Sequence, residues 1–68
     1  MRLSARNQLA GRVTRVHEGA AIGNVEIDVG GQRMVASITV EAIRELRLAE
    51  GAEVIAIVKA SDVMLAVP

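Results

Sequence analysis

A chain of 68 residues is near the lower limit at which one hydrophobic core outweighs the conformational entropy lost on folding, and it has no Cys and one His for disulfides or a zinc site. Apolar residues make up 51% of it without any aromatic side chain, more aliphatic surface than so small a monomer can bury, so we expect one domain, residues 1–68, that forms a homo-oligomer. Eight basic and eight acidic residues cancel, which excludes the long-range field that attracts nucleic acid or an anionic membrane.

The N-terminal segment, residues 1–7, lacks the apolar stretch of a signal peptide. No apolar run elsewhere in the chain approaches the roughly 20 residues that a membrane span needs. We therefore expect a cytoplasmic protein with no membrane partner.

Residues 9–17 predict a long first strand, because they are rich in β-branched side chains. Val13 and Val16 do not keep the strict alternation of a regular strand. This departure indicates a bulge or a bend near Gly11.

A β-hairpin is predicted next. Residues 25–29 alternate apolar and acidic side chains, which is the period of a strand with one face in water. Gly30-Gly31 is typical of a tight hairpin turn, because glycine readily adopts positive φ. The returning strand is expected to place Met34, Ala36 and Ile38 on one face, and Val35 and Ser37 on the other.

A short helix is predicted from Val40 to about Leu48. Thr39 is a suitable N-cap, because its hydroxyl can accept a hydrogen bond from an unpaired N–H group of the first turn. Apolar residues recur on one side of this segment, and Gly51 follows as a turn residue.

Two further strands are expected at residues 54–58 and 63–67. Both are apolar at odd and even positions, so a strand there would have two faces to bury. Five strands with one helix between the third and the fourth predict an all-β fold, a small five-stranded barrel resembling the OB-fold.

The set of reactive side chains argues against an enzyme. One His, no Cys and no cluster of His with carboxylates exclude the common zinc spacings and make a nucleophile–base pair improbable. The sequence also has no phosphate-binding G-x-x-x-x-G-K-[ST] motif.

Two short polar segments carry donors suited to an anion. Ser4 and Arg6 precede the first strand, Lys59 and Ser61 follow the fourth, and residues i and i+2 of an extended segment share a face. A dianionic oxyanion has only acceptor oxygens, so such a site needs N–H and O–H donors and positive charge. A site made only of donors should also disfavour a protonated phosphate. The alternative is that Arg6 and Lys59 are ordinary surface cations paired with carboxylates.

Four segments of the chain form a characteristic combination: Ser4 to Leu9 (SARNQL), Gly30-Gly31, Ser37-Ile38-Thr39 and Lys59-Ala60-Ser61. Together they resemble the molbindin (Mop) family. The resemblance implies a protein that binds molybdate, or tungstate, for storage and homeostasis in the cytoplasm. It also implies a trimer of dimers with the anion held between subunits.

The same resemblance implies two kinds of oxyanion site. A second site near the three-fold axes would use His17 and the segment from Gly19 to Asn24. The alternative for His17 is a partly exposed strand residue without a ligand. Ala42 stands where relatives commonly carry Ser, so we expect no side-chain contact from it. The main site would use Ser4, Ala5, Arg6, Lys59, Ala60 and Ser61 of one chain with Thr39 of a neighbour.

Two other functions are compatible with an OB-type barrel. A nucleic-acid-binding domain would rely on aromatic stacking and a basic groove, whereas this chain has no aromatic residue and no net charge. In a purely structural oligomerisation module, the same hydroxyls and cations would only pair with one another across a subunit interface. Its melting temperature would not respond to molybdate.

Overall fold

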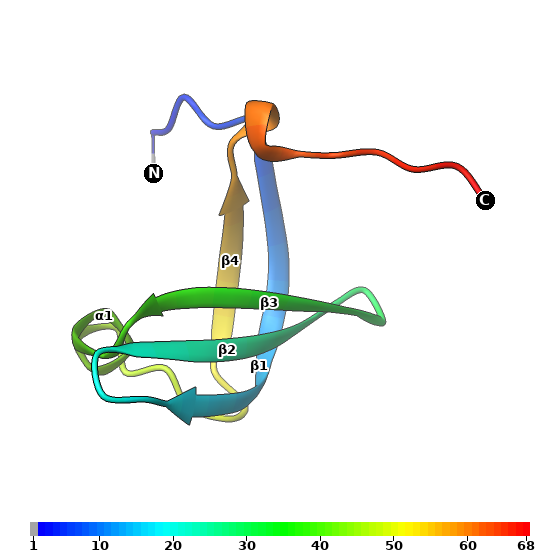
Figure 1. Ribbon diagram of the computed structural model, residues 1–68. Helices are drawn as coiled ribbons and strands as arrows, with labels where there is room; N and C mark the ends of the chain where they lie inside the picture. Colours follow the sequence, from blue (N-terminus) through cyan, green and yellow to red (C-terminus); the bar gives the residue numbers. More distant parts are fainter. Residues whose placement is uncertain (1) are drawn as a thin grey trace.

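The computed structural model describes residues 2–68 and consists mostly of antiparallel sheet with one short helix (Figure 1). The strands form one four-stranded sheet in the order β3-β2-β1-β4. No helix among the described residues is long and apolar enough to cross a membrane. The elements are β1 (Asn7–Glu18), β2 (Ile22–Val29), β3 (Gln32–Thr39), α1 (Val40–Glu45), β4 (Glu53–Val58) and a 3-10 turn, η1 (Ala60–Asp62).

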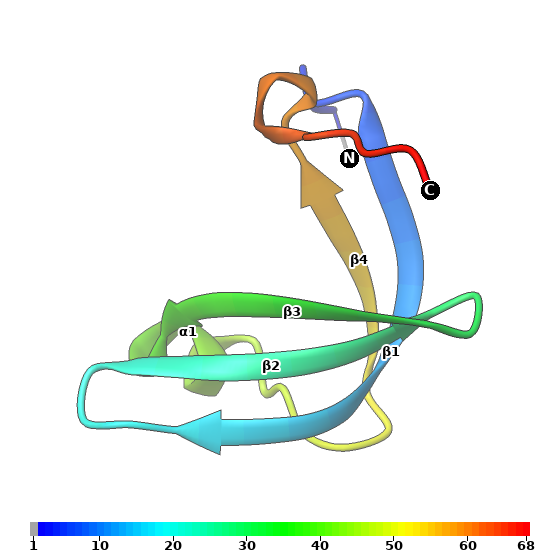
Figure 2. The same ribbon diagram turned by 45° about the vertical axis from the view of Figure 1, so that its right-hand side comes forward.

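The long strand β1 belongs to both halves of the molecule. Its first half pairs with β4, and its second half pairs with β2, so that the β1–β4 pair stands across the β2–β3 hairpin (Figure 2). The pairing register of β1 with β2 shifts between Val13 and Arg15, which places the predicted bulge at Thr14 rather than near Gly11. Gly11 matters for a different reason, because a Cβ there would lie 2.6 Å from Ile27 Cγ2 and 2.8 Å from the Asp28 carbonyl oxygen.

The β2–β3 hairpin is as predicted. Gly30 and Gly31 form its turn with φ of 57° and 87°, values that favour glycine. In β3 the two predicted faces are confirmed: Met34, Ala36 and Ile38 are partly buried, and Val35 and Ser37 are exposed.

The helix α1 begins as predicted but ends earlier. The Thr39 hydroxyl accepts a hydrogen bond from the Ala42 N–H at 3.1 Å, so Thr39 is the N-cap. The expected end near Leu48 is wrong, because Arg47 adopts a left-handed conformation, φ 52°, that stops the helix after Glu45.

The hydrophobic core is small and lies where α1 packs against β1 and β2. The radius of gyration is 12.6 Å, which exceeds the about 11 Å expected of a compact chain of this length. A single chain is therefore open rather than closed around its core. The buried apolar residues are Val13, Val25, Ile27, Val40 and Ile43.

The predicted fifth strand and closed barrel are wrong for the single chain. Residues 63–67 follow η1, pair with no strand of the described chain, and extend away from the sheet (Figures 1 and 2). Met64, Leu65 and Val67 are 93%, 93% and 91% exposed. Apolar patterning identified a segment that needs burial, but it could not show that the chain directs this segment away from its own sheet.

Candidate functional site

The two polar segments singled out in the sequence lie together at one end of the β1–β4 pair. Asn7, the first residue of β1, is the register partner of Val58, the last residue of β4. The Asn7 side-chain amide donates to the Val58 carbonyl oxygen at 3.2 Å, which joins the two strand ends. Antiparallel pairing thus places the segment before β1 beside the segment after β4.

These segments surround an open pocket of about 610 Å³. It contains all six residues expected from a single chain, and two more that were not expected. Ile57 lies in β4 two residues before Lys59, whose backbone is also extended, so the alternation of an extended segment could have indicated it. Asp62 directly follows Ser61, and its position beside the predicted motif was the available signal. The lining residues are Ser4, Ala5, Arg6, Ile57, Lys59, Ala60, Ser61 and Asp62.

The backbone after β4 also has a conformation that exposes donors. Lys59 is extended and caps the 3-10 turn, whose internal bonds run from Asp62 N–H to the Lys59 carbonyl oxygen and from Val63 N–H to that of Ala60. The first N–H groups of such a turn precede its first internal bond. Those of Ala60 and Ser61 therefore remain available to an acceptor.

Four of the seven arginines in residues 2–68 form ion pairs, whereas the two cations of the pocket, like Arg2 and Arg47, do not. Within residues 2–68, neither Arg6 nor Lys59 forms the ion pair with a carboxylate that the alternative expects. Four other arginines do pair: Arg12 with Glu53 at 3.3 Å, Arg15 and Arg33 with Glu26 at 3.9 and 2.6 Å, and Arg44 with Glu18 at 3.1 Å.

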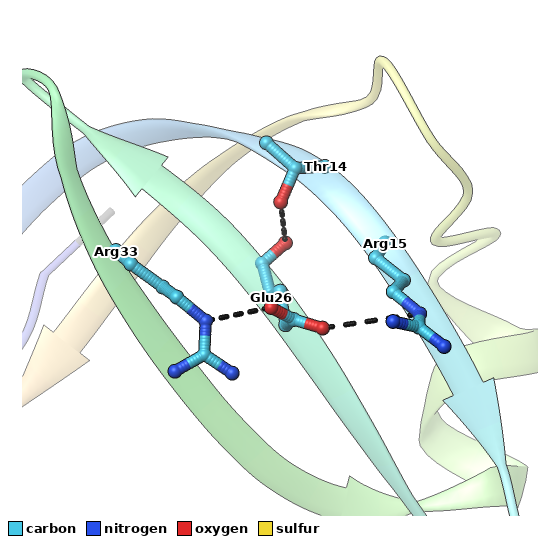
Figure 3. A network of polar contacts seen from close by, with 4 residues as sticks. All are labelled: Thr14, Arg15, Glu26 and Arg33. Carbon is cyan, nitrogen blue, oxygen red and sulfur yellow. Dashed lines mark hydrogen bonds and ion pairs between the residues drawn. The ribbon is translucent and has the colours of Figure 1, made fainter.

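The Glu26 network shows how the remaining charges are used (Figure 3). Glu26 lies between Arg15 and Arg33 on the outer face of the sheet, and its carbonyl oxygen accepts from the Thr14 hydroxyl at 3.1 Å. The hydrogen bond from Arg33 lowers the pKa of the Glu26 carboxyl group, and the positive charges of Arg33 and Arg15 act in the same direction. Through Glu26 of β2, Arg15 links β1 and Arg33 links β3 to the middle of the sheet.

Thr39 does not line this pocket. It is the last residue of β3, and its hydroxyl oxygen already accepts from the Ala42 N–H. In both views the helix α1, which follows it, lies far from the end of β4 (Figures 1 and 2). A single chain therefore does not bring Thr39 to the other six residues.

The residues of the second expected site lie at the far end of the β1–β2 pair. His17 and Asn24 are register partners, and Gly19 is in the connecting turn, where its N–H donates to the Ile22 carbonyl oxygen at 3.0 Å. Asn24 Oδ1 accepts from the Ser37 hydroxyl, and His17 is exposed. Across the described residues, no group of three His, Cys, Asp or Glu side chains could hold a metal cation.

A larger groove of about 1240 Å³ lies along the two free edges of the sheet. It is lined by residues 34–38 of β3 and residues 53–58 of β4, together with parts of β1, β2 and the region after α1. Much of this lining is aliphatic, and Ile55 and Leu46 are 53% and 66% exposed. The groove is thus apolar surface that a single chain leaves in water.

The sequence matches a known family and several characterised relatives. The family model described as the TOBE domain matches residues 3–65. Molybdenum-pterin-binding protein 2 of Clostridium pasteurianum is 39% identical over 66 residues, covering 96% of this chain and 97% of that protein. Such relatives are binding proteins and not enzymes, which confirms the expectation that this chain is not an enzyme.

Two solved structures are similar over most of the chain. A molybdate binding protein from Sporomusa ovata has a TM-score of 0.93 and 32% identity, and the match covers 97% of this chain and 98% of that one. The cytoplasmic molybdate-binding protein ModG has a TM-score of 0.86 and 46% identity, and the match covers 88% of this chain and 43% of that one.

Proposed function

This chain belongs to the molbindin (Mop) family of TOBE domains, and on that premise we propose that it binds molybdate and releases it chemically unchanged. The observation that carries the proposal is one pocket lined by Ser4, Arg6, Lys59 and Ser61, in which neither cation forms an ion pair within residues 2–68. The names of the relatives, which bind molybdate or molybdenum-pterin, support molybdate as the ligand.

The donors of the pocket match the needs of a tetrahedral dianion. Arg6 offers a planar fork of N–H groups and Lys59 a compact charge, while the serine hydroxyls and the N–H groups near Ala5 and Ala60 are short neutral donors. These groups replace the water shell of the anion, and the two positive charges offset its desolvation. Tungstate has the same shape and charge, so we propose it as a second ligand.

We propose that the pocket is completed by a second copy of the chain. Thr39, which does not reach the pocket within one chain, would come from that copy. The assembly implied by the family resemblance is a trimer of dimers, and the open sheet supports association. The free edges of β3 and β4 and the apolar groove along them are surfaces that a single chain leaves uncovered.

The C-terminal segment is the part of a second copy that suits this groove. Residues 63–67 are apolar and exposed, and as a strand they would span about 17 Å, close to the length of the six-residue β4. A strand added between β3 and β4 would close the barrel that the single chain leaves open. This exchange would bury both the segment and the groove.

The biological role that we propose is storage of molybdate in the cytoplasm. Binding without reaction, a small oligomer and a site that stabilises its own assembly when occupied are suited to a buffer of free anion. The description of ModG as cytoplasmic supports the location.

A second oxyanion site is proposed at His17, Gly19 and Asn24. Register pairing places His17 beside Asn24, and Gly19 is in the turn that links their strands. The purified oligomer is then expected to bind more molybdate ions than it has main pockets. His17→Ala should remove only the ions in excess of that number.

Isothermal titration of the purified protein with molybdate tests the main site. Arg6→Gln and Lys59→Gln should each weaken binding by a few kcal/mol if the anion is desolvated in the pocket. Arg47→Gln is the matched control, because it removes an exposed cation that does not line the pocket. Equal affinity for molybdate and sulfate would contradict selectivity, and no response of the melting temperature to molybdate would favour the structural module. Tight binding of single-stranded DNA in a filter assay would favour the nucleic-acid alternative.

A further inference from the structure

Asp62 gives the oxyanion pocket an acceptor among its donors. Asp62 lines the same pocket as Arg6, Lys59 and the two serines. Its backbone N–H donates to the Lys59 carbonyl oxygen at 2.9 Å, so the turn holds Asp62 close to Ser61. Across residues 2–68 its carboxylate makes no hydrogen bond or ion pair. Asp62 therefore adds an acceptor to the donors that the sequence predicts for this pocket.

A carboxylate at this position acts on two classes of oxyanion in opposite ways. It repels a fully deprotonated dianion such as molybdate or sulfate, because like charges at short range raise the energy of the complex. A protonated oxyanion such as hydrogen phosphate carries an O–H group, and an ionised carboxylate is a strong acceptor for it. The position of Asp62 therefore bears on which oxyanion binds.

We propose that Asp62 is a specificity-determining residue of this pocket, which lowers the affinity for deprotonated tetrahedral dianions and favours their protonated counterparts. This inference rests on the proposed function, since it concerns the ligands of the same site. Arg6 and Lys59 are not neutralised by ion pairs within the described chain, so Asp62 reduces the charge facing the ligand without removing its positive sign.

Such a carboxylate has a consequence for release. A pocket that binds its ligand with less than the full attraction of two cations loses it faster, because most affinity differences between related sites appear in the dissociation rate. Asp62 thus speeds the release of molybdate, and it also lowers the ratio of molybdate affinity to phosphate affinity.

The test is titration of the intact protein at neutral pH and low salt with molybdate, sulfate and inorganic phosphate. Sulfate and phosphate are tetrahedral and similar in size. At this pH phosphate keeps at least one O–H group, and sulfate and molybdate have none. Asp62→Asn and Asp62→Ala both remove the charge, and only Asn adds a donor. Glu45→Gln, which changes an exposed carboxylate outside the pocket, is the matched control.

For both Asp62 variants we expect molybdate and sulfate to bind roughly two- to fivefold more tightly, the range of one exposed charge interaction. Phosphate should gain nothing or lose affinity, so the ratio of molybdate to phosphate affinity rises. The gain should shrink at high salt, because screening weakens charge repulsion. Circular dichroism of each variant checks that it folds as the parent does.

An equal change for all three anions, no change, or a gain confined to Asp62→Asn would overturn the role of the Asp62 carboxylate while leaving the site itself intact. If the unmodified protein binds none of the anions, the proposed function fails and this inference fails with it. Asp62→Glu, which keeps the charge, should preserve the original order of affinities, and loss of that order would also count against the proposal.

Discussion

The Asn7 side chain donates to the Val58 carbonyl oxygen at 3.2 Å, at the point where β1 begins and β4 ends. This bond joins residues 51 positions apart in the sequence and lies at the base of both polar segments of the pocket. We expect Asn7→Ala to lower the free energy of unfolding by about 1 kcal/mol and to weaken molybdate binding as well. Urea unfolding and titration measure the two effects. Gln8→Ala, at the exposed neighbouring position, should change neither.

Gly11 is predicted to tolerate no side chain. In Gly11→Ala the new Cβ would lie 2.6 Å from Ile27 Cγ2 and 2.8 Å from the Asp28 carbonyl oxygen, and the backbone oxygen cannot move without disturbing β2. We expect a loss of about 1–3 kcal/mol in the free energy of unfolding, as for other overpacked sites. Gly30→Ala is a useful comparison, because no atom lies within 4 Å of a Cβ there and only its positive φ opposes the change. A Gly11 variant as stable as the parent would contradict the close approach of β1 and β2.

Glu26 should make stability depend on acid pH. Its pKa is lowered in the folded protein, chiefly by the hydrogen bond from Arg33, so its contribution is complete above the pKa of the unfolded chain and disappears as the pH falls through the folded value. We expect the parent to be more stable than Glu26→Gln at neutral pH, and this difference to vanish in acid. Urea midpoints at several pH values measure it. A difference that persists in acid would exclude the ionised carboxylate as its cause.

The C-terminal segment is predicted to hold the oligomer together. Leu65→Asp should shift the protein toward monomers, because Leu65 is 93% exposed in one chain and would be buried against a second copy. Light scattering after size-exclusion chromatography measures the mass. Ala49→Asp, an equal charge change at an exposed position between α1 and β4 that does not line the groove, is the control. An unchanged mass for Leu65→Asp would argue against exchange of this segment.

Thr39 tests whether the second copy completes the pocket. Asp is as good an N-cap as Thr, so Thr39→Asp should leave the start of α1 and the melting temperature nearly unchanged. A negative charge beside a bound dianion should nevertheless reduce molybdate affinity by at least about tenfold if the groups meet with little intervening water. Unchanged affinity would place Thr39 outside the site. Loss of stability alone would show only a capping role.

Several elements could be predicted from the sequence because each is determined by interactions between residues close together in the chain. The glycine pair of the hairpin, the Thr39 cap and the alternation of β3 each depend on residues close in sequence. The end of α1 was not predictable, because Arg47 has no glycine-like signal for its left-handed conformation. The bulge at Thr14 likewise follows from register with β2, and register is a property of two strands.

The sequence by itself determined that the chain is small, uncharged overall, rich in aliphatic residues and supplied with two donor segments, because composition and spacing alone carry those properties. Only the tertiary structure decided that the segments meet, since antiparallel pairing of Asn7 with Val58 is what brings them together. It also decided that Asp62 lines the pocket and that residues 63–67 leave the sheet. Both depend on where the chain turns after β4, a direction set by packing and backbone hydrogen bonds and not by residue type.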